Sequence, residues 1–194
     1  MRNLRPIVLL AFLGLVLAGP ARAQSVDVFF GLNALTAQQA QSSIPRLGGG
    51  LFPSVGADIM LLHTFGVGAE FTYRQKSNNY ANTSARPAYY DVNAIWMPFH
   101  LPFLSPEIQV GLGAAHLQAY QAVANCNGAT NCFNVAEANH LTGHLGAGLR
   151  INLVHGFFLR PEAHFYYIRH NLALARTAQR FGVSLGYSFG GILP

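Results

Sequence analysis

Eight segments of this chain alternate apolar residues with small or polar ones, and a period of two residues predicts β-strands. The pattern is clearest in the last segment, "FGVSLGYSF", where large apolar side chains take every second position. The segments lie at about residues 25–33, 53–62, 65–76, 87–97, 106–120, 139–153, 157–169 and 178–189. Each is close to or longer than the roughly 9 to 11 residues that a tilted strand needs to cross a bilayer.

The connections between these segments alternate between short and long. Short connections lie at 63–64, 98–105 and 154–156, and long polar ones at 34–50, 77–86, 121–138 and 170–178. An even number of strands, with short turns at one end and long loops at the other, is the plan of an outer-membrane barrel. We therefore predict an all-β fold, an eight-stranded antiparallel up-and-down transmembrane β-barrel with both termini in the periplasm.

The two faces of these strands differ in charge. One parity carries apolar side chains such as Val92, Leu112 and Leu149, and none of them is charged. The opposite parity collects the charges, which we assign to a network in the lumen: Asp27, Asp58, Glu70, Arg74, Asp91, Glu107, Arg150, Arg160, Glu162 and Arg180.

The split alone does not show which face points inward, because a soluble barrel would have the same split with its apolar face inside. The glycines decide between the two arrangements. Ten glycines share the parity of the charges. An eight-stranded barrel is just wide enough inside for side chains, so charged ones fit there only beside small neighbours. A solvated face has no use for glycine, which weakens strands, and would carry more lysines than Lys76 alone. We therefore place the charges inside and the apolar face toward lipid.

Ions inside a barrel must be paired, because an unpaired buried charge costs several kcal/mol. The "VHG" turn at 154–156 suggests a register with Arg150 opposite Arg160 and Glu162 on the diagonal. We interpret the network as structural filling. A hydrated path that passes small ions poorly is the alternative.

Aromatic residues fall near both ends of the predicted strands, as two interfacial girdles would. One group lies toward the short turns and the other toward the long loops. The first contains Trp96, Tyr187 and Phe189, and the second contains Tyr73, Tyr90, Tyr120 and Tyr167.

The first 23 residues read as a secretory signal peptide. Arg2 and Arg5 precede an apolar run, and the segment ends in a small-x-small motif before Gln24. We expect cleavage there, leaving residues 24–194 as one barrel domain. Three of the twelve basic residues leave with the signal, so nine face seven acids and the formal charge falls from +5 to +2. This balance gives no electrostatic argument for binding nucleic acid.

Cys126 and Cys132 lie in "NCNGATNC", inside a predicted long loop. In an exported protein, such an even pair predicts a disulfide that closes a small loop. A metal site is the competing reading, but the segment offers no second pair of soft ligands. His140 and His144 share a strand face, yet four residues of strand span about 13 Å, too far for one ion. We predict no metal site and no cofactor.

The chain resembles the small OmpA and OmpX type of outer-membrane β-barrel over essentially its whole mature length. The resemblance rests on the signal peptide, on the alternating segments "VGAEFTYR", "GLGAAHL" and "GHLGAGLRINL", and on the closing "RFGVSLGYSFG". It departs from the pattern at the end, where "SFGGILP" replaces a terminal aromatic residue. The resemblance implies a monomer, with outer-membrane lipids and the barrel assembly machinery as partners.

Some barrels of this class are lipid A enzymes, and their motifs are missing here. A deacylase of this kind would show His-x-Ser, but no histidine is followed by serine two residues later, and "HLT" at 140–142 is the nearest approach. An acyltransferase would show Asp-Ser, which is also missing. We therefore predict no enzyme, but a structural or surface-interaction role through four extracellular loops. A narrow low-conductance pore and a lipid A-modifying enzyme are the alternatives.

Overall fold

The computed structural model describes residues 25–37, 48–75, 78–80, 83–121, 133–169 and 176–190, and for 78–80, 83–85, 118–121 and 133–138 it describes the backbone alone. Nine strands and one 3-10 turn make up this part of the chain. They are β1 (Ser25–Ala37), β2 (Leu51–Met60), β3 (Phe65–Tyr73), β4 (Asn78–Tyr80), β5 (Thr83–Trp96), β6 (Leu104–Gln121), β7 (Phe133–Asn152), η1 (Val154–Gly156), β8 (Phe157–Ile168) and β9 (Thr177–Phe189).

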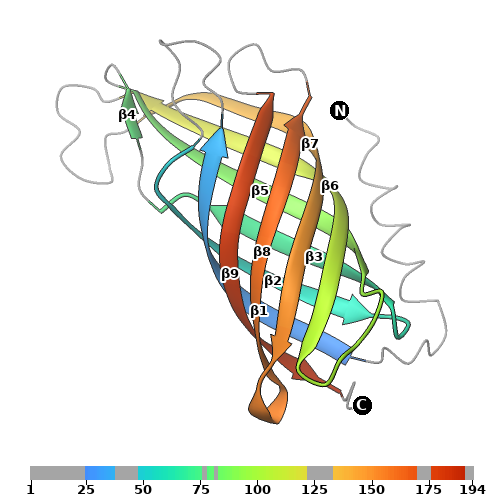
Figure 1. Cartoon of the computed structure of the whole chain (residues 1–194). Helices are drawn as coiled ribbons and strands as arrows, with labels where there is room; N and C mark the ends of the chain where they lie inside the picture. The colour runs from blue at the N-terminus through green and yellow to red at the C-terminus, as the bar shows by residue number, and fades with distance from the viewer. Residues whose placement is uncertain are drawn as a thin grey trace.

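Eight long strands close into one barrel, with the short β4 added beside β5 (Figure 1). Every pairing is antiparallel, β1 pairs with both β2 and β9, and the β3–β5 pairing completes the circle. The predicted all-β, eight-stranded antiparallel up-and-down barrel is therefore confirmed. None of the helical segments among the described residues is long and apolar enough to span a membrane.

The two ends of the barrel differ, and we name them by their connections. At the short-turn end lie residues 61–64, 97–103 and 153–156, together with the start of β1 and the end of β9. The long-loop end is the opposite one, where β1, β3 and β6 end.

Several strands extend farther at the long-loop end than the sequence predicted, whereas β3 ends earlier, at Tyr73. β7 begins at Phe133, inside the connection predicted at 121–138, and β4 pairs with Thr83–Ala85, inside the connection predicted at 77–86. β1 likewise continues to Ala37. On β1 the extension escapes a search for apolar alternation because the residue types change faces: apolar Leu35 is buried and polar Thr36 is exposed.

Burial follows the parity of each strand. On β1, β3 and β9 exposed and buried residues alternate, and most exposed ones are apolar, such as Phe30, Val67 and Leu185. The exceptions, Thr36 and Gln179, lie near the long-loop end. The inward-facing charged residues, such as Asp58 and Glu70, are buried. In a transmembrane barrel the exposed apolar positions face lipid.

Several inward-facing glycines lie opposite large inward side chains on the neighbouring strand. Gly56 is paired with Phe29, and a Cβ atom at Gly56 would collide with the Phe29 ring. Gly186 is related in the same way to Phe158. Glycine thus makes room for a large side chain on the adjacent strand, which is why glycines and charges share one parity.

The predicted interfacial aromatics lie toward the two ends of the barrel. At the short-turn end the Trp96 ring stacks on Phe65, with centroids 6.3 Å apart, and Tyr187 contacts Phe157 and Phe189. At the other end Tyr73, Tyr90 and Tyr167 are exposed. The backbone of Tyr120 belongs to β6, and its side chain lies outside the described residues.

Candidate functional site: the charged interior

Strand β8 lines the barrel with a column of buried side chains from one end to the other. Every second residue points inward because the strand alternates its faces. From the short-turn end, the column consists of Phe158, Arg160, Glu162, His164, Tyr166 and Ile168.

Arg160 is the centre of the ion network. Its Nη1 atom lies 2.8 Å from Asp58 Oδ2 on β2 and 3.0 Å from Glu107 Oε1 on β6. Its Nε atom lies 3.1 Å from Glu162 Oε2 on its own strand. The guanidinium also lies over the Phe29 ring at 4.2 Å. One cation therefore serves three carboxylates from three strands.

A second cation, Arg180 on β9, lies toward the long-loop end from Arg160. Its Nη2 atom donates to Glu70 Oε2 at 2.6 Å, and its Nη1 atom donates to the Thr72 hydroxyl at 2.7 Å. Glu162 Oε1 lies 3.9 Å from the same Nη2 atom. Glu162 therefore links the two arginines, and both arginine side chains are only 1% exposed.

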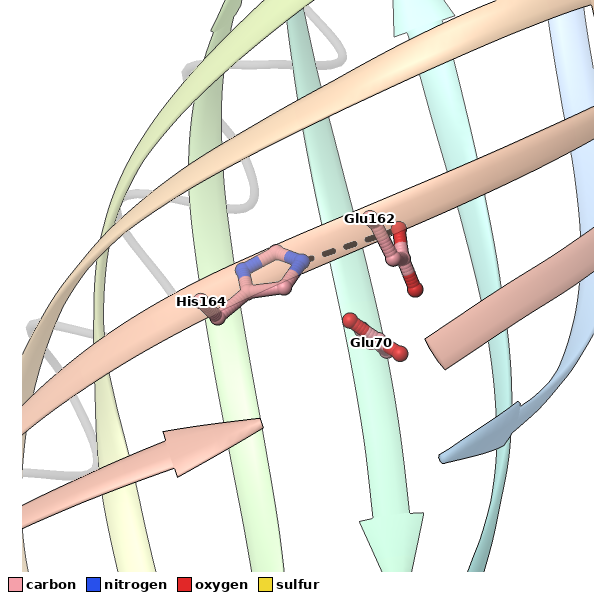
Figure 2. Close-up of side chains that lie close together, drawn as sticks. All are labelled: Glu70, Glu162 and His164. Atoms are coloured by element: carbon pink, nitrogen blue, oxygen red, sulfur yellow. Dashed lines mark ion pairs between the residues drawn. The ribbon is translucent and has the colours of Figure 1, made fainter. Parts of the chain in front are cut away.

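Glu70, Glu162 and His164 form a compact group that the two strands β3 and β8 bring together (Figure 2). One ligand atom from each residue lies within 4.8 Å of the other two, and His164 Nε2 is 3.6 Å from Glu162 Oε2. Such a set of ligands resembles a metal site in composition. However, Arg180 and Arg160 already pair with its carboxylates, so a metal cation there would meet two guanidinium groups. The electrostatics favour an ion network over a metal centre.

Asp91 on β5 has a different set of partners. Its Oδ2 atom accepts a hydrogen bond from the Tyr166 hydroxyl at 3.0 Å, and its Oδ1 atom lies 3.5 Å from His144 Nδ1. His144 in turn packs edge-on against His164, with ring centroids 5.3 Å apart. The two histidines thus connect Asp91 to Glu162.

The remaining predicted network residues lie nearer the ends of the lumen. Asp27 pairs with Arg150, whose guanidinium also lies 4.0 Å from the Phe158 ring centroid. Arg74 lies at the long-loop end, where its Nη2 atom donates to the Gly48 carbonyl oxygen at 3.4 Å.

Two apolar clusters lie beyond the ionic centre. Toward the short-turn end, Met60, Ile95 and Met97 pack together. The larger cluster, toward the long-loop end, contains Leu35, Phe52, Tyr89, Ala115, Tyr166, Ile168 and Ala178. The larger cluster therefore separates the central carboxylates from the long-loop end.

Some inward residues were missed from the sequence, above all His144, His164 and Tyr166. Each shares the parity of the charges on its strand, and this signal could have identified them. His140 and His144 are too far apart along one strand to share an ion, whereas His164 meets His144 across two neighbouring strands. Cys126 and Cys132 lie outside the described residues, so their disulfide stays a prediction.

No protein-family model and no curated protein sequence matches the chain. Solved structures do resemble it. The N-terminal barrel domain of Pseudomonas aeruginosa OprF has a TM-score of 0.55 at 15% identity, covering 86% of this chain and 98% of that one. Ail, the attachment invasion locus protein of Yersinia pestis, has a TM-score of 0.57 at 13% identity, and the match covers 86% of this chain and 99% of Ail. Neisserial surface protein A has a TM-score of 0.55 at 10% identity, and the match covers 85% of this chain and 96% of that one.

At these identities the likeness shows the fold alone. The three neighbours are small barrels of outer-membrane type, as the sequence resemblance implied. The chain therefore has the architecture of a small outer-membrane β-barrel.

Proposed function

We propose that this protein is exported through its cleaved signal peptide, folds into the outer membrane as a monomer, and acts without enzymatic chemistry by presenting its long loops to an extracellular partner. The observation that carries this proposal is the filled interior. Because paired ions and apolar clusters occupy the lumen, the long-loop end is the part that remains for recognition.

Strand lengths support a presenting role. β6 has 18 residues and β7 has 20, whereas crossing a bilayer takes about 9 to 11. The two strands pair as far as Gln121 and Phe133. Their excess length forms a two-stranded β-ribbon at the long-loop end.

Charge supports an anionic partner. Arg86, Arg169 and Arg176 are exposed at the long-loop end. The carboxylates with described side chains all belong to the lumen network. Ail has been crystallised with the heparin analogue sucrose octasulfate, which fits such a partner class. We therefore propose a sulfated or phosphorylated polyanion as the ligand, bound in a salt-dependent way.

The test uses a triple variant, Arg86→Ser with Arg169→Ser and Arg176→Ser, in detergent-folded protein. The triple variant should elute from a heparin column at a lower salt concentration than the wild type. A second variant, with 122–132 replaced by a Gly-Ser linker of equal length, separates the loop from the basic residues. Unchanged retention of both variants would contradict the polyanion proposal. Heat-shifted gel mobility checks that each variant is folded.

The pore and enzyme alternatives have less support. A pore needs a continuous polar path, but Tyr89 and Tyr166 pack against each other at 5.4 Å within the apolar cluster. A lipid-modifying enzyme needs its reacting groups on the lipid-facing surface. Among the described residues, the carboxylate–histidine pairs lie in the lumen instead.

A further inference from the structure

The three short turns of the barrel have an unusual composition. They read "LLHT" at 61–64, "MPFHLPF" at 97–103 and "LVHG" at 153–156. They contain no Asp, Glu, Lys or Arg, and their only titratable residues are His63, His100 and His155. Turns that project into water normally carry polar residues.

Apart from the buried Met97, the large apolar side chains of these turns are exposed. Leu62 is 59% exposed, Phe103 77% and Val154 72%. We call the set the turn patch: Leu61, Leu62, Phe99, Leu101, Phe103, Leu153 and Val154. On a soluble surface, so many exposed apolar side chains at one end of the molecule would mark an interaction site.

The turn patch continues the lipid-facing surface. Phe65, Trp96 and Phe157 begin or end the strands beside the turns, and all three are exposed apolar residues. No charged residue separates them from the turn patch. The established lipid interface and the turn patch are therefore one surface.

On β3 the apolar belt is shorter than the apolar band of an outer-membrane barrel. On β3 the lipid-facing residues run from Phe65 to Tyr73, which at about 3.3 Å per residue and a tilt of roughly 40° covers roughly 20 Å. The apolar band of outer-membrane barrels is about 25 Å tall. At the long-loop end Arg74 and Gln75 follow Tyr73 directly. On this strand the turn at 61–64 would supply the missing height, whereas on β8 the outward residues from Phe157 to Tyr167 already cover roughly 25 Å.

We propose that the turn patch lies in the headgroup and acyl-chain boundary of the inner leaflet, so that its partner is phospholipid and the short turns do not project into the periplasm. Neutral histidine suits this boundary better than a formal charge. Burial and the nearby Arg150 and His63 lower the pKa of His100, which favours its neutral form.

The test places an environment-sensitive NBD label at single cysteines in a Cys126→Ser, Cys132→Ser background. Val154→Cys and Phe103→Cys report on the turn patch. Gln75→Cys, exposed at the other end of β3, is the matched control. The variants are reconstituted into phosphatidylethanolamine–phosphatidylglycerol vesicles, with and without lipids brominated near the carbonyl end of the acyl chain. Iodide is supplied on both sides of the membrane.

Brominated lipid should quench the labels at 154 and 103 several-fold more than the label at 75, and iodide should quench them several-fold less. Equal iodide quenching at all three positions, without quenching by brominated lipid, would place the turns in water and overturn the proposal. Protection from both quenchers would also overturn it, since it would show that a second copy covers the turn patch. Leu62→Cys replaces any variant that lacks heat-shifted mobility.

Discussion

Arg160 on β8 and Asp58 on β2 join two strands that are not neighbours in the barrel, with Nη1 2.8 Å from Oδ2. The same guanidinium reaches Glu107 on β6. These bonds cross the lumen and fix its width, while backbone pairing fixes only adjacent strands.

Replacing Arg160 should therefore lower the free energy of unfolding substantially. Arg160→Met leaves Asp58, Glu107 and Glu162 without their shared cation, and breaking a buried ion pair costs about 3 to 5 kcal/mol. Urea unfolding in detergent micelles, followed by tryptophan fluorescence, measures the loss. Arg86→Met, at an exposed position, is the control and should change stability by less than about 1 kcal/mol. Equal effects of the two substitutions would mean that the network does not stabilise the barrel.

The glycines of the lumen should resist enlargement. Gly56→Val would drive two methyl groups into the Phe29 ring, and overpacking of this kind typically costs about 1 to 3 kcal/mol. Ala57→Val, one residue farther along on the lipid face, should be nearly neutral. Adding Phe29→Ala to Gly56→Val should recover part of the loss. No recovery in the double variant would show that this pair is not the cause.

A charged side chain on the outer face should destabilise the folded barrel more at the centre of the membrane than near its edge. Val183 and Gln179 are exposed on the same face of β9. Val183→Arg should cost about 2 to 4 kcal/mol and Gln179→Arg about 0 to 1. Folding yield into lipid vesicles measures the difference, and equal yields would contradict the assignment of the lipid face.

The face that each residue takes could be predicted from sequence, because parity is a local property. On β8, for example, Arg160 and Glu162 were both assigned to the lumen, where the structure has them. The predicted β7–β8 register also agrees with the pairs Gly148–Glu162 and Ile151–Leu159 that flank Arg150 and Arg160.

The partners of each charge could not be predicted in the same way. Arg150 pairs with Asp27 on β1, which is three strands away around the barrel. Such contacts depend on the tilt and stagger of the closed barrel, which local alternation does not contain. The start of β7 was missed for the related reason that the apolar alternation is lost toward the long-loop end.

The cysteine pair stays a prediction that chemistry can test. A thiol titration of the denatured, unreduced protein should detect no free thiol at Cys126 or Cys132. Because so small a ring contributes only about 2 to 3 kcal/mol by chain entropy, Cys126→Ser with Cys132→Ser should still fold. Protease added to whole cells should cut the variant loop faster than the native loop. Two free thiols in the wild type would refute the bridge.

The central claim is a membrane-inserted barrel whose lumen is closed by its own side chains, and planar-bilayer recording tests it most directly. The protein should first show a heat-dependent change in gel mobility, which establishes that it is folded, and vesicle flotation should establish that it is inserted. Under these conditions we predict no steady single-channel conductance above that of the bare bilayer. Uniform, long-lived conductance steps from the wild-type protein would contradict the account, because they would require a continuous aqueous path past Arg160 and Arg180.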